Sequence, residues 1–120
     1  VRLYPEGVRS IVGNLVENAR KYAAVPEGGE PIRVVTRRTG GEVVLEVLDR
    51  GPGIPESERE RVFEAFYRVG NETTRTAKGT GLGLHLVALQ ADAMGGRVEV
   101  LARPGGGTIF RVHLVATDEA

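Results

Sequence analysis

Two pairs of β-rich segments, each interrupted by a short glycine-containing turn, constrain the fold of this chain most strongly. IRVVTRR (residues 32–38) and EVVLEVLD (residues 42–49) flank TGG, and RVEVLA (residues 97–102) and TIFRVHLV (residues 108–115) flank RPGGG. β-Branched runs separated by a few turn residues are typical of antiparallel hairpins. The sequence therefore predicts two hairpins.

Three segments with helical character alternate with the hairpins. Apolar residues recur at helical spacing from about Glu6 to Ala23 and over residues 82–94, which precede Gly95-Gly96, a good helix stop. Acidic residues in the first turn of PESERERVFEAF (residues 55–66) predict a short helix there. The order of elements predicts an α/β fold, a two-layer α/β sandwich with three main helices on a mixed, mostly antiparallel sheet.

Composition and charge exclude several classes of protein. The 120 residues suffice for one domain, and the 16 basic and 16 acidic side chains cancel, unlike those of a general nucleic-acid binder. Without cysteine there is no disulfide, thiol nucleophile or cysteine metal site. The apolar runs are too short for a membrane span or a signal peptide. We expect a single domain, residues 1–120, excised from a longer protein.

A polar stripe runs along the first predicted helix. Asn14, Glu17, Asn18 and Lys21 share an arc of about 100° beside the apolar face, at the spacing that aligns helical side chains. One interpretation is a solvated stripe with a Glu17–Lys21 ion pair. However, asparagine is a mediocre helix former, and amide and carboxylate oxygens beside a lysine suit a divalent cation and a phosphate. We therefore interpret the stripe as a binding site.

Asp49 is predicted to point into the core, because it shares the alternation of Val43, Leu45 and Val47. A buried carboxylate needs a donor. Either a loop backbone amide or an amino group on a ligand fits this requirement. Gly51 and Gly53 follow, and glycines allow a ligand to approach the backbone closely.

KGTGLGL (residues 78–84) places a glycine-rich turn before the last predicted helix. Free backbone amides and the positive end of the helix dipole make such a turn an anion site, although glycines also provide a flexible hinge. The spacing of the glycines fits neither a P-loop nor a dinucleotide-binding fingerprint.

These motifs together resemble the ATP-binding catalytic domain of sensor histidine kinases, within the superfamily of DNA gyrase, Hsp90 and MutL. NLVENARKYA resembles the N box, DRGPGIP the first glycine box, FEAFYR the F box and GTGLGL the second glycine box. They occur in the family's order, and the resemblance covers Glu6 to Leu114. It implies the Bergerat-type ATP-binding fold, with residues 69–80 as a mobile ATP lid.

The resemblance implies a site for ATP and Mg²⁺, with Asn18 as the metal ligand. It implies that Asp49 accepts a hydrogen bond from the exocyclic amino group of adenine. Glu17, Lys21 and Arg75 are the candidate catalytic residues, with a structural role for Glu17 as the alternative. The other implied nucleotide-binding positions are Asn14, Tyr22, Gly51, Gly53, Ile54, Lys78, Gly79, Thr80, Gly81, Leu82, Gly83 and Thr108.

The family's phosphoacceptor histidine is expected outside this chain, because His85 and His113 both fit surface positions. The implied partners are a dimerisation and histidine-phosphotransfer domain of the same kinase and, indirectly, a response regulator. Nucleic acid and direct membrane contact are not expected. The fragment is expected to be a monomeric, cytoplasmic part of a membrane-anchored kinase. The alternatives are a free-standing serine kinase of the anti-sigma type and a nucleotide-sensing module without transfer activity.

Overall fold

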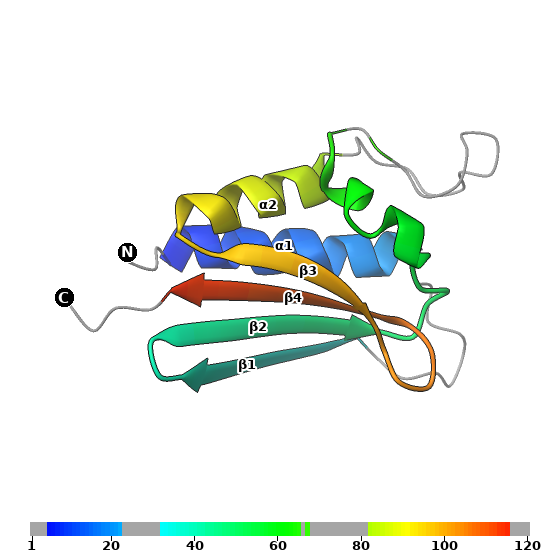
Figure 1. The fold of residues 1–120 in the computed structure, drawn as a ribbon, viewed down its shortest axis with the longest axis horizontal. Helices are drawn as coiled ribbons and strands as arrows, with labels where there is room; N and C mark the ends of the chain where they lie inside the picture. Colours follow the sequence, from blue (N-terminus) through cyan, green and yellow to red (C-terminus); the bar gives the residue numbers. More distant parts are fainter. Residues whose placement is uncertain (1–4, 23–31, 66, 68–81, 116–120) are drawn as a thin grey trace.

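The computed structural model describes residues 5–22, 32–65, 67 and 82–115. Within these ranges, two α-helices lie side by side on one face of a four-stranded sheet (Figure 1). The elements are α1 (Pro5–Tyr22), β1 (Arg33–Thr39), β2 (Glu42–Asp49), the 3-10 turns η1 (Glu56–Glu58) and η2 (Arg61–Phe63), α2 (Gly83–Ala93), β3 (Arg97–Ala102) and β4 (Thr108–Val115). The two-layer α/β sandwich predicted from the sequence is therefore confirmed.

The sheet has the strand order β1-β2-β4-β3, and all of its described pairings are antiparallel. Both predicted hairpins, β1–β2 and β3–β4, are present. They join along the central pair β2–β4, where Leu45 lies opposite Val112 and Asp49 lies opposite Thr108. This register brings the last residue of β2 and the first residue of β4 to the same end of the sheet.

The core lies between the helices and the sheet. Ile11, Leu15 and Ala19 of α1 are buried, as their helical spacing predicts, and the central strands contribute Val47 and Phe110. The α2 side chains Val87 and Ala91 complete the layer. Across the two helices, Gln90 Nε2 donates a hydrogen bond to Ser10 Oγ at 2.8 Å. In the described residues, no helix is long and apolar enough to cross a bilayer.

Within the segment predicted as one helix over residues 55–66, the described residues 55–65 form two short 3-10 turns instead, at Glu56–Glu58 and Arg61–Phe63. Its described residues include one buried side chain, Val62, so packing stabilises only single turns. The chain becomes extended at Glu64, which ends η2. Polar contacts hold the turns together, because Tyr67 OH donates to Glu58 Oε1 at 2.6 Å and the guanidinium of Arg61 lies 5.3 Å from the Tyr67 ring centroid.

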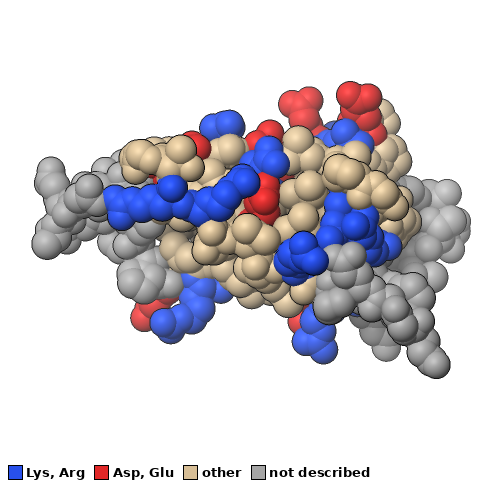
Figure 2. Space-filling model, turned by 90° about the horizontal axis from the view of Figure 1, so that it is seen from below, with Lys and Arg blue, Asp and Glu red and all other residues tan. Residues whose placement is uncertain are grey.

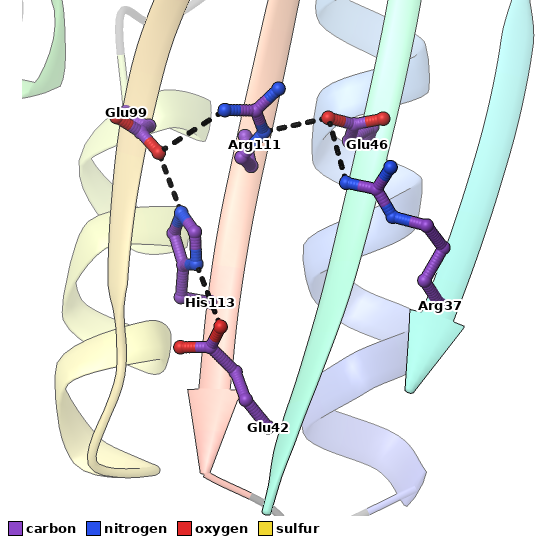
Figure 3. Close-up of polar contacts among 6 residues, drawn as sticks. All are labelled: Arg37, Glu42, Glu46, Glu99, Arg111 and His113. Atoms are coloured by element: carbon purple, nitrogen blue, oxygen red, sulfur yellow. Dashed lines mark hydrogen bonds and ion pairs between the residues drawn. The ribbon is translucent and has the colours of Figure 1, made fainter. Parts of the chain in front are cut away.

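The face of the sheet opposite the helices carries basic side chains with acidic ones between them (Figure 2). Glu46 lies at the centre of this face with its side chain 9% exposed. It accepts a hydrogen bond from Arg111 Nε at 2.6 Å and pairs with Arg37 at 3.5 Å (Figure 3). Two guanidinium groups therefore compensate a nearly buried carboxylate, as a charge in this position requires.

His113 lies in the same network and is not the surface histidine that the sequence suggested. Its side chain is 13% exposed, and it lies between Glu99 at 2.5 Å and Glu42 at 3.3 Å (Figure 3). The hydrogen bond from His113 holds the pKa of the Glu99 carboxyl below its ordinary value of 4.5, with weaker contributions from Arg111 and Arg97. The network links β2, β4 and β3 across the outer face.

Candidate nucleotide-binding site

Asp49 ends β2 with its side chain on the helix-covered side of the sheet. The residue is 4% exposed, in agreement with the inward orientation that its alternation with Val47 predicts. Its Oδ1 accepts a hydrogen bond from the backbone N–H of Gly51 at 2.8 Å. Thr108, which is also buried, lies directly opposite on β4. A loop amide, one of the two partners considered for Asp49, therefore does bind it, and this hydrogen bond uses one of the two carboxylate oxygens.

The loop after Asp49 follows a path that its glycines permit. Gly53 has a φ of +80°, a conformation that side chains disfavour, and a Cβ there would lie 3.5 Å from the carbonyl oxygen of Gly107. Ile54 packs against the hydrophobic core, and its carbonyl accepts a hydrogen bond from Arg59 Nε at 3.1 Å. The loop therefore passes between the core and the turn that joins β3 to β4.

The polar stripe of α1 adjoins the start of α2. Asn14 and Asn18 are half-buried, whereas Glu17 is exposed. Asn14 Oδ1 lies 3.9 Å from the position of a Cβ on Gly83, the first residue of α2. Leu82, the N-cap residue of α2, contributes no side-chain cap hydrogen bond, and the first backbone N–H groups of an α-helix have no acceptor within the helix itself. Amide oxygens and helix N–H groups therefore border the same space.

These oxygens fit Mg²⁺ better than a transition metal. The described residues contain no group of three or more His, Cys, Asp or Glu side chains that could hold a metal ion. Mg²⁺ takes few protein ligands and uses hard oxygens, including those of substrate phosphates. The half-buried amide of Asn18 offers such an oxygen, so the donor set is compatible with Mg²⁺ bound together with a phosphate.

Part of the predicted site lies outside the described residues. This part comprises the side chains of Lys21 and Tyr22, the residues Arg75, Lys78, Gly79, Thr80 and Gly81, and the segment 69–80. The positions that the structure does describe group at two places. At the end of β2, Asp49 lies opposite Thr108 and is followed by the loop that carries Gly51, Gly53 and Ile54. Where α1 adjoins α2, Asn14 lies beside Gly83, the residue after Leu82, and Asn18 follows Asn14 by one helical turn.

Two residues near the site make contacts that the sequence did not predict. His85 was expected at the surface, but it is half-buried and its Nδ1 lies 3.1 Å from the backbone oxygen of Phe63. The Phe63 ring packs edge-on against Phe110, with ring centroids 6.3 Å apart. Arg50, the second residue of DRGPGIP, hydrogen-bonds to a turn more than fifty residues further along the chain. No local pattern signals either contact.

The sequence of this chain is similar to those of known proteins. A family model described as "Histidine kinase-, DNA gyrase B-, and HSP90-like ATPase" matches residues 4–118, and the chain belongs to this family. The histidine-protein kinase AfsQ2 of Streptomyces coelicolor is 38% identical over 113 residues, which are 94% of this chain and 20% of AfsQ2. The chain thus spans about a fifth of that relative.

Solved structures show the same fold. The mycobacterial sensor histidine kinase MprB superposes with a TM-score of 0.80 at 33% identity, over 96% of this chain and 76% of that chain. Full-length ShkA in complex with AMPPNP gives a TM-score of 0.76 at 34% identity, over 95% of this chain and 22% of ShkA. The sandwich is thus that of histidine kinase catalytic domains.

Proposed function

We propose that this domain binds Mg·ATP and donates the γ-phosphoryl group to a histidine on a separate dimerisation domain of a sensor histidine kinase. The observation that supports the proposal most strongly is that one domain contains two complementary sets of polar groups, one at the end of β2 and one where α1 adjoins α2. A buried carboxylate, which accepts a hydrogen bond from a loop amide through one oxygen, lies at the end of β2, and the amide stripe of α1 adjoins the N-terminus of α2 where Asn14 lies beside Gly83.

The carboxylate end suits a purine base. Asp49 accepts a hydrogen bond from the exocyclic amino group of adenine, and the Gly51 amide holds the carboxylate in place. Gly51, Gly53 and Ile54 line the base, and Thr108 lies behind it. A buried acceptor discriminates against a base that presents an oxygen at this position, because two acceptors would face each other without a proton.

The helix end suits the triphosphate. Asn18 holds Mg²⁺ with Asn14 in support, and Mg²⁺ supplies charge neutralisation and orientation for phosphoryl transfer. The first backbone N–H groups of α2, from Leu82 and Gly83 onward, bind phosphate oxygens at the positive end of the helix dipole. In our proposal Lys21, Tyr22, Arg75, Lys78, Gly79, Thr80 and Gly81 complete the site, and residues 69–80 act as its lid.

Glu17 acts either as a general base or in a supporting role, and its substitution distinguishes the two. A general base at this position predicts a loss of about 10²- to 10⁴-fold in transfer rate for Glu17→Gln, as is usual for general acid–base catalysis. A supporting role predicts a change of a few fold. Phosphoryl transfer depends mainly on positioning and charge neutralisation, for which Lys21 and Arg75 are the candidate cations.

The proposed setting is the cytoplasmic part of a membrane-anchored kinase. The acceptor belongs to the dimerisation and phosphotransfer domain of the same kinase, a response regulator receives the phosphoryl group afterwards, and the isolated chain is a monomer. A serine kinase of the anti-sigma type and a nucleotide sensor without transfer activity are the rival functions.

Isothermal titration of the chain with ATP and GTP, each with and without Mg²⁺, tests the binding proposal. We expect Mg²⁺-dependent binding of ATP, weaker binding of GTP and a large loss of ATP affinity in Asp49→Asn. Incubation with labelled ATP and a separate dimerisation domain tests transfer, because only a histidine kinase labels a histidine there. If neither wild type nor Asp49→Asn binds adenine nucleotides, the proposed function is wrong.

A further inference from the structure

Arg50 connects the loop that follows Asp49 to the turn between β3 and β4. Its Nη1 donates hydrogen bonds to the carbonyl oxygen of Pro104 at 2.6 Å and to that of Gly106 at 2.9 Å. These acceptors lie 54 and 56 residues further along the chain. A single guanidinium nitrogen thus joins two segments that are adjacent only in the folded sheet.

The turn that accepts these bonds is shaped to lie against the same loop. Gly105, Gly106 and Gly107 all have positive φ, at +86°, +109° and +116°. A Cβ on Gly107 would overlap the carbonyl oxygen of Asp49 and lie 2.9 Å from the Cα of Arg50. The turn therefore packs directly on the backbone of residues 49–50, at a distance that only glycine allows.

The turn is itself held in one conformation. The Arg103 N–H donates to the Gly107 oxygen at 3.1 Å, and the Gly106 N–H donates to the Arg103 oxygen at 2.9 Å. Gly53 completes the contact, because its Cβ position lies 3.5 Å from the same Gly107 oxygen. The two hydrogen bonds of Arg50 thus attach the start of an irregular loop to a closed hairpin turn.

We infer that Arg50 is a positioning residue for the base pocket. It holds residues 49–53 against the β3–β4 turn before a nucleotide binds, so that the Asp49 carboxylate and the glycine backbone are already in place. The inference rests on the proposed function, since it assigns Asp49 to the base. Ordering a loop in advance removes an entropic cost from binding without adding a contact to the ligand.

The competing explanation is that an exposed arginine forms surface hydrogen bonds that contribute little. The two explanations differ in what Arg50→Ala changes. A surface contact alone leaves nucleotide affinity unaffected. If Arg50 positions the loop, Arg50→Ala weakens ADP and ATP binding by about three- to tenfold, the effect of losing one or two ordinary hydrogen bonds. The same substitution raises KM for ATP and leaves the transfer rate at saturating ATP unchanged, because Arg50 touches no reacting group.

The experiment compares wild type, Arg50→Ala and Arg50→Lys with Arg9→Ala, which removes an exposed arginine from α1. ADP affinity is measured by titration calorimetry, and exchange of the Gly51 amide, which donates to Asp49, is measured by NMR without nucleotide. We expect faster exchange and weaker ADP binding in Arg50→Ala, partial rescue in Arg50→Lys, which keeps a donor, and no change in Arg9→Ala. Melting temperatures within a few degrees of wild type show that the fold is retained.

Unchanged exchange and unchanged ADP affinity in Arg50→Ala would overturn the inference. Loss of affinity without rescue by lysine and with a matching fall in melting temperature would also overturn it, because the effect would then be global. Failure of the proposed function is seen separately as absence of ADP and ATP binding by wild type. In that case the exchange comparison still decides whether Arg50 orders the loop.

Discussion

The side-chain oxygen of Asn14 faces the first residue of α2, 3.9 Å from where a Cβ would stand on Gly83. This relationship joins two motifs that are 69 positions apart, the amide stripe of α1 and the second glycine box. In the proposed function the triphosphate and its Mg²⁺ lie beside this contact. The absence of a side chain at Gly83 keeps the space open.

Gly83→Ala is expected to weaken Mg·ATP binding without destabilising the domain. The methyl group fits at an ordinary contact distance, but it narrows the space between Asn14 and the helix terminus. Alanine also favours a helix by up to about 1 kcal/mol over glycine. Calorimetry and urea unfolding measure the two effects. Gly13→Ala, where nothing lies within 4 Å, should give the helix gain alone. Full Mg·ATP affinity in Gly83→Ala would contradict the assigned phosphate position.

Asn18→Asp is expected to leave the fold intact and to reduce phosphotransfer by at least about tenfold. The carboxylate is isosteric with the amide, but it adds a negative charge beside the phosphates and changes the metal ligand. The rate of histidine labelling by the parent kinase is the measurement. Gly13→Asp serves as the control, since it adds a carboxylate at an exposed position of α1 with no neighbour within 4 Å. Wild-type transfer by Asn18→Asp would remove Asn18 from the metal site.

Gly107→Ala is expected to lower the free energy of unfolding by more than about 3 kcal/mol, whereas Gly106→Ala costs about 1–2 kcal/mol. Both glycines have similar positive φ, at +116° and +109°, so both variants carry similar backbone strain. Only at Gly107 does the new Cβ also meet the Asp49 backbone. Urea unfolding of the two variants isolates that steric overlap. Equal losses would show that the turn can move away from β2.

The Glu99 carboxyl should make stability depend on acidic pH. Its folded pKa is lowered from 4.5, chiefly by the hydrogen bond from His113, so its contribution exists above the unfolded pKa and is lost as the pH falls through the folded pKa. We expect Glu99→Gln to destabilise at pH 7 by less than about 1 kcal/mol, because the pair is partly exposed. Its stability should then fall less steeply than that of wild type below about pH 4.5.

Unfolding by urea at pH 7 and at pH 3.5 measures this difference. Glu60→Gln, which removes an exposed carboxylate between η1 and η2, is the control. A pH profile of Glu99→Gln that parallels wild type would show that the contact with His113 adds nothing to folding.

Patterns of period two and of helical period predict most of the architecture. The alternation in EVVLEVLD predicts both a buried Val47 and a buried Asp49, and the helical spacing of Ile11, Leu15 and Ala19 predicts the core face of α1. Local periodicity reports which face of an element is buried, and that information is present within a few neighbouring residues.

Features that depend on distant contacts could not be predicted in this way. Residues 55–66 have helical first-turn signals, but among the described residues 55–65 Val62 is the one buried side chain, so this part gains too little packing for a continuous helix. His113 follows the outward alternation, yet carboxylates of two neighbouring strands cover it. The contact of Arg50 with the β3–β4 turn exists only because β2 and β4 are paired.

The strand order also determines how this sheet can assemble. Each outer pair, β1–β2 and β3–β4, is a local hairpin. In the central pair β2–β4, by contrast, the paired residues Asp49 and Thr108 are separated in sequence by most of the second half of the chain. Local hairpins close within microseconds, and pairing of distant segments costs more loop entropy. We expect the two halves to form early and their joining along β2–β4 to limit the folding rate, so a substitution at this seam should slow refolding more than one at an outer strand.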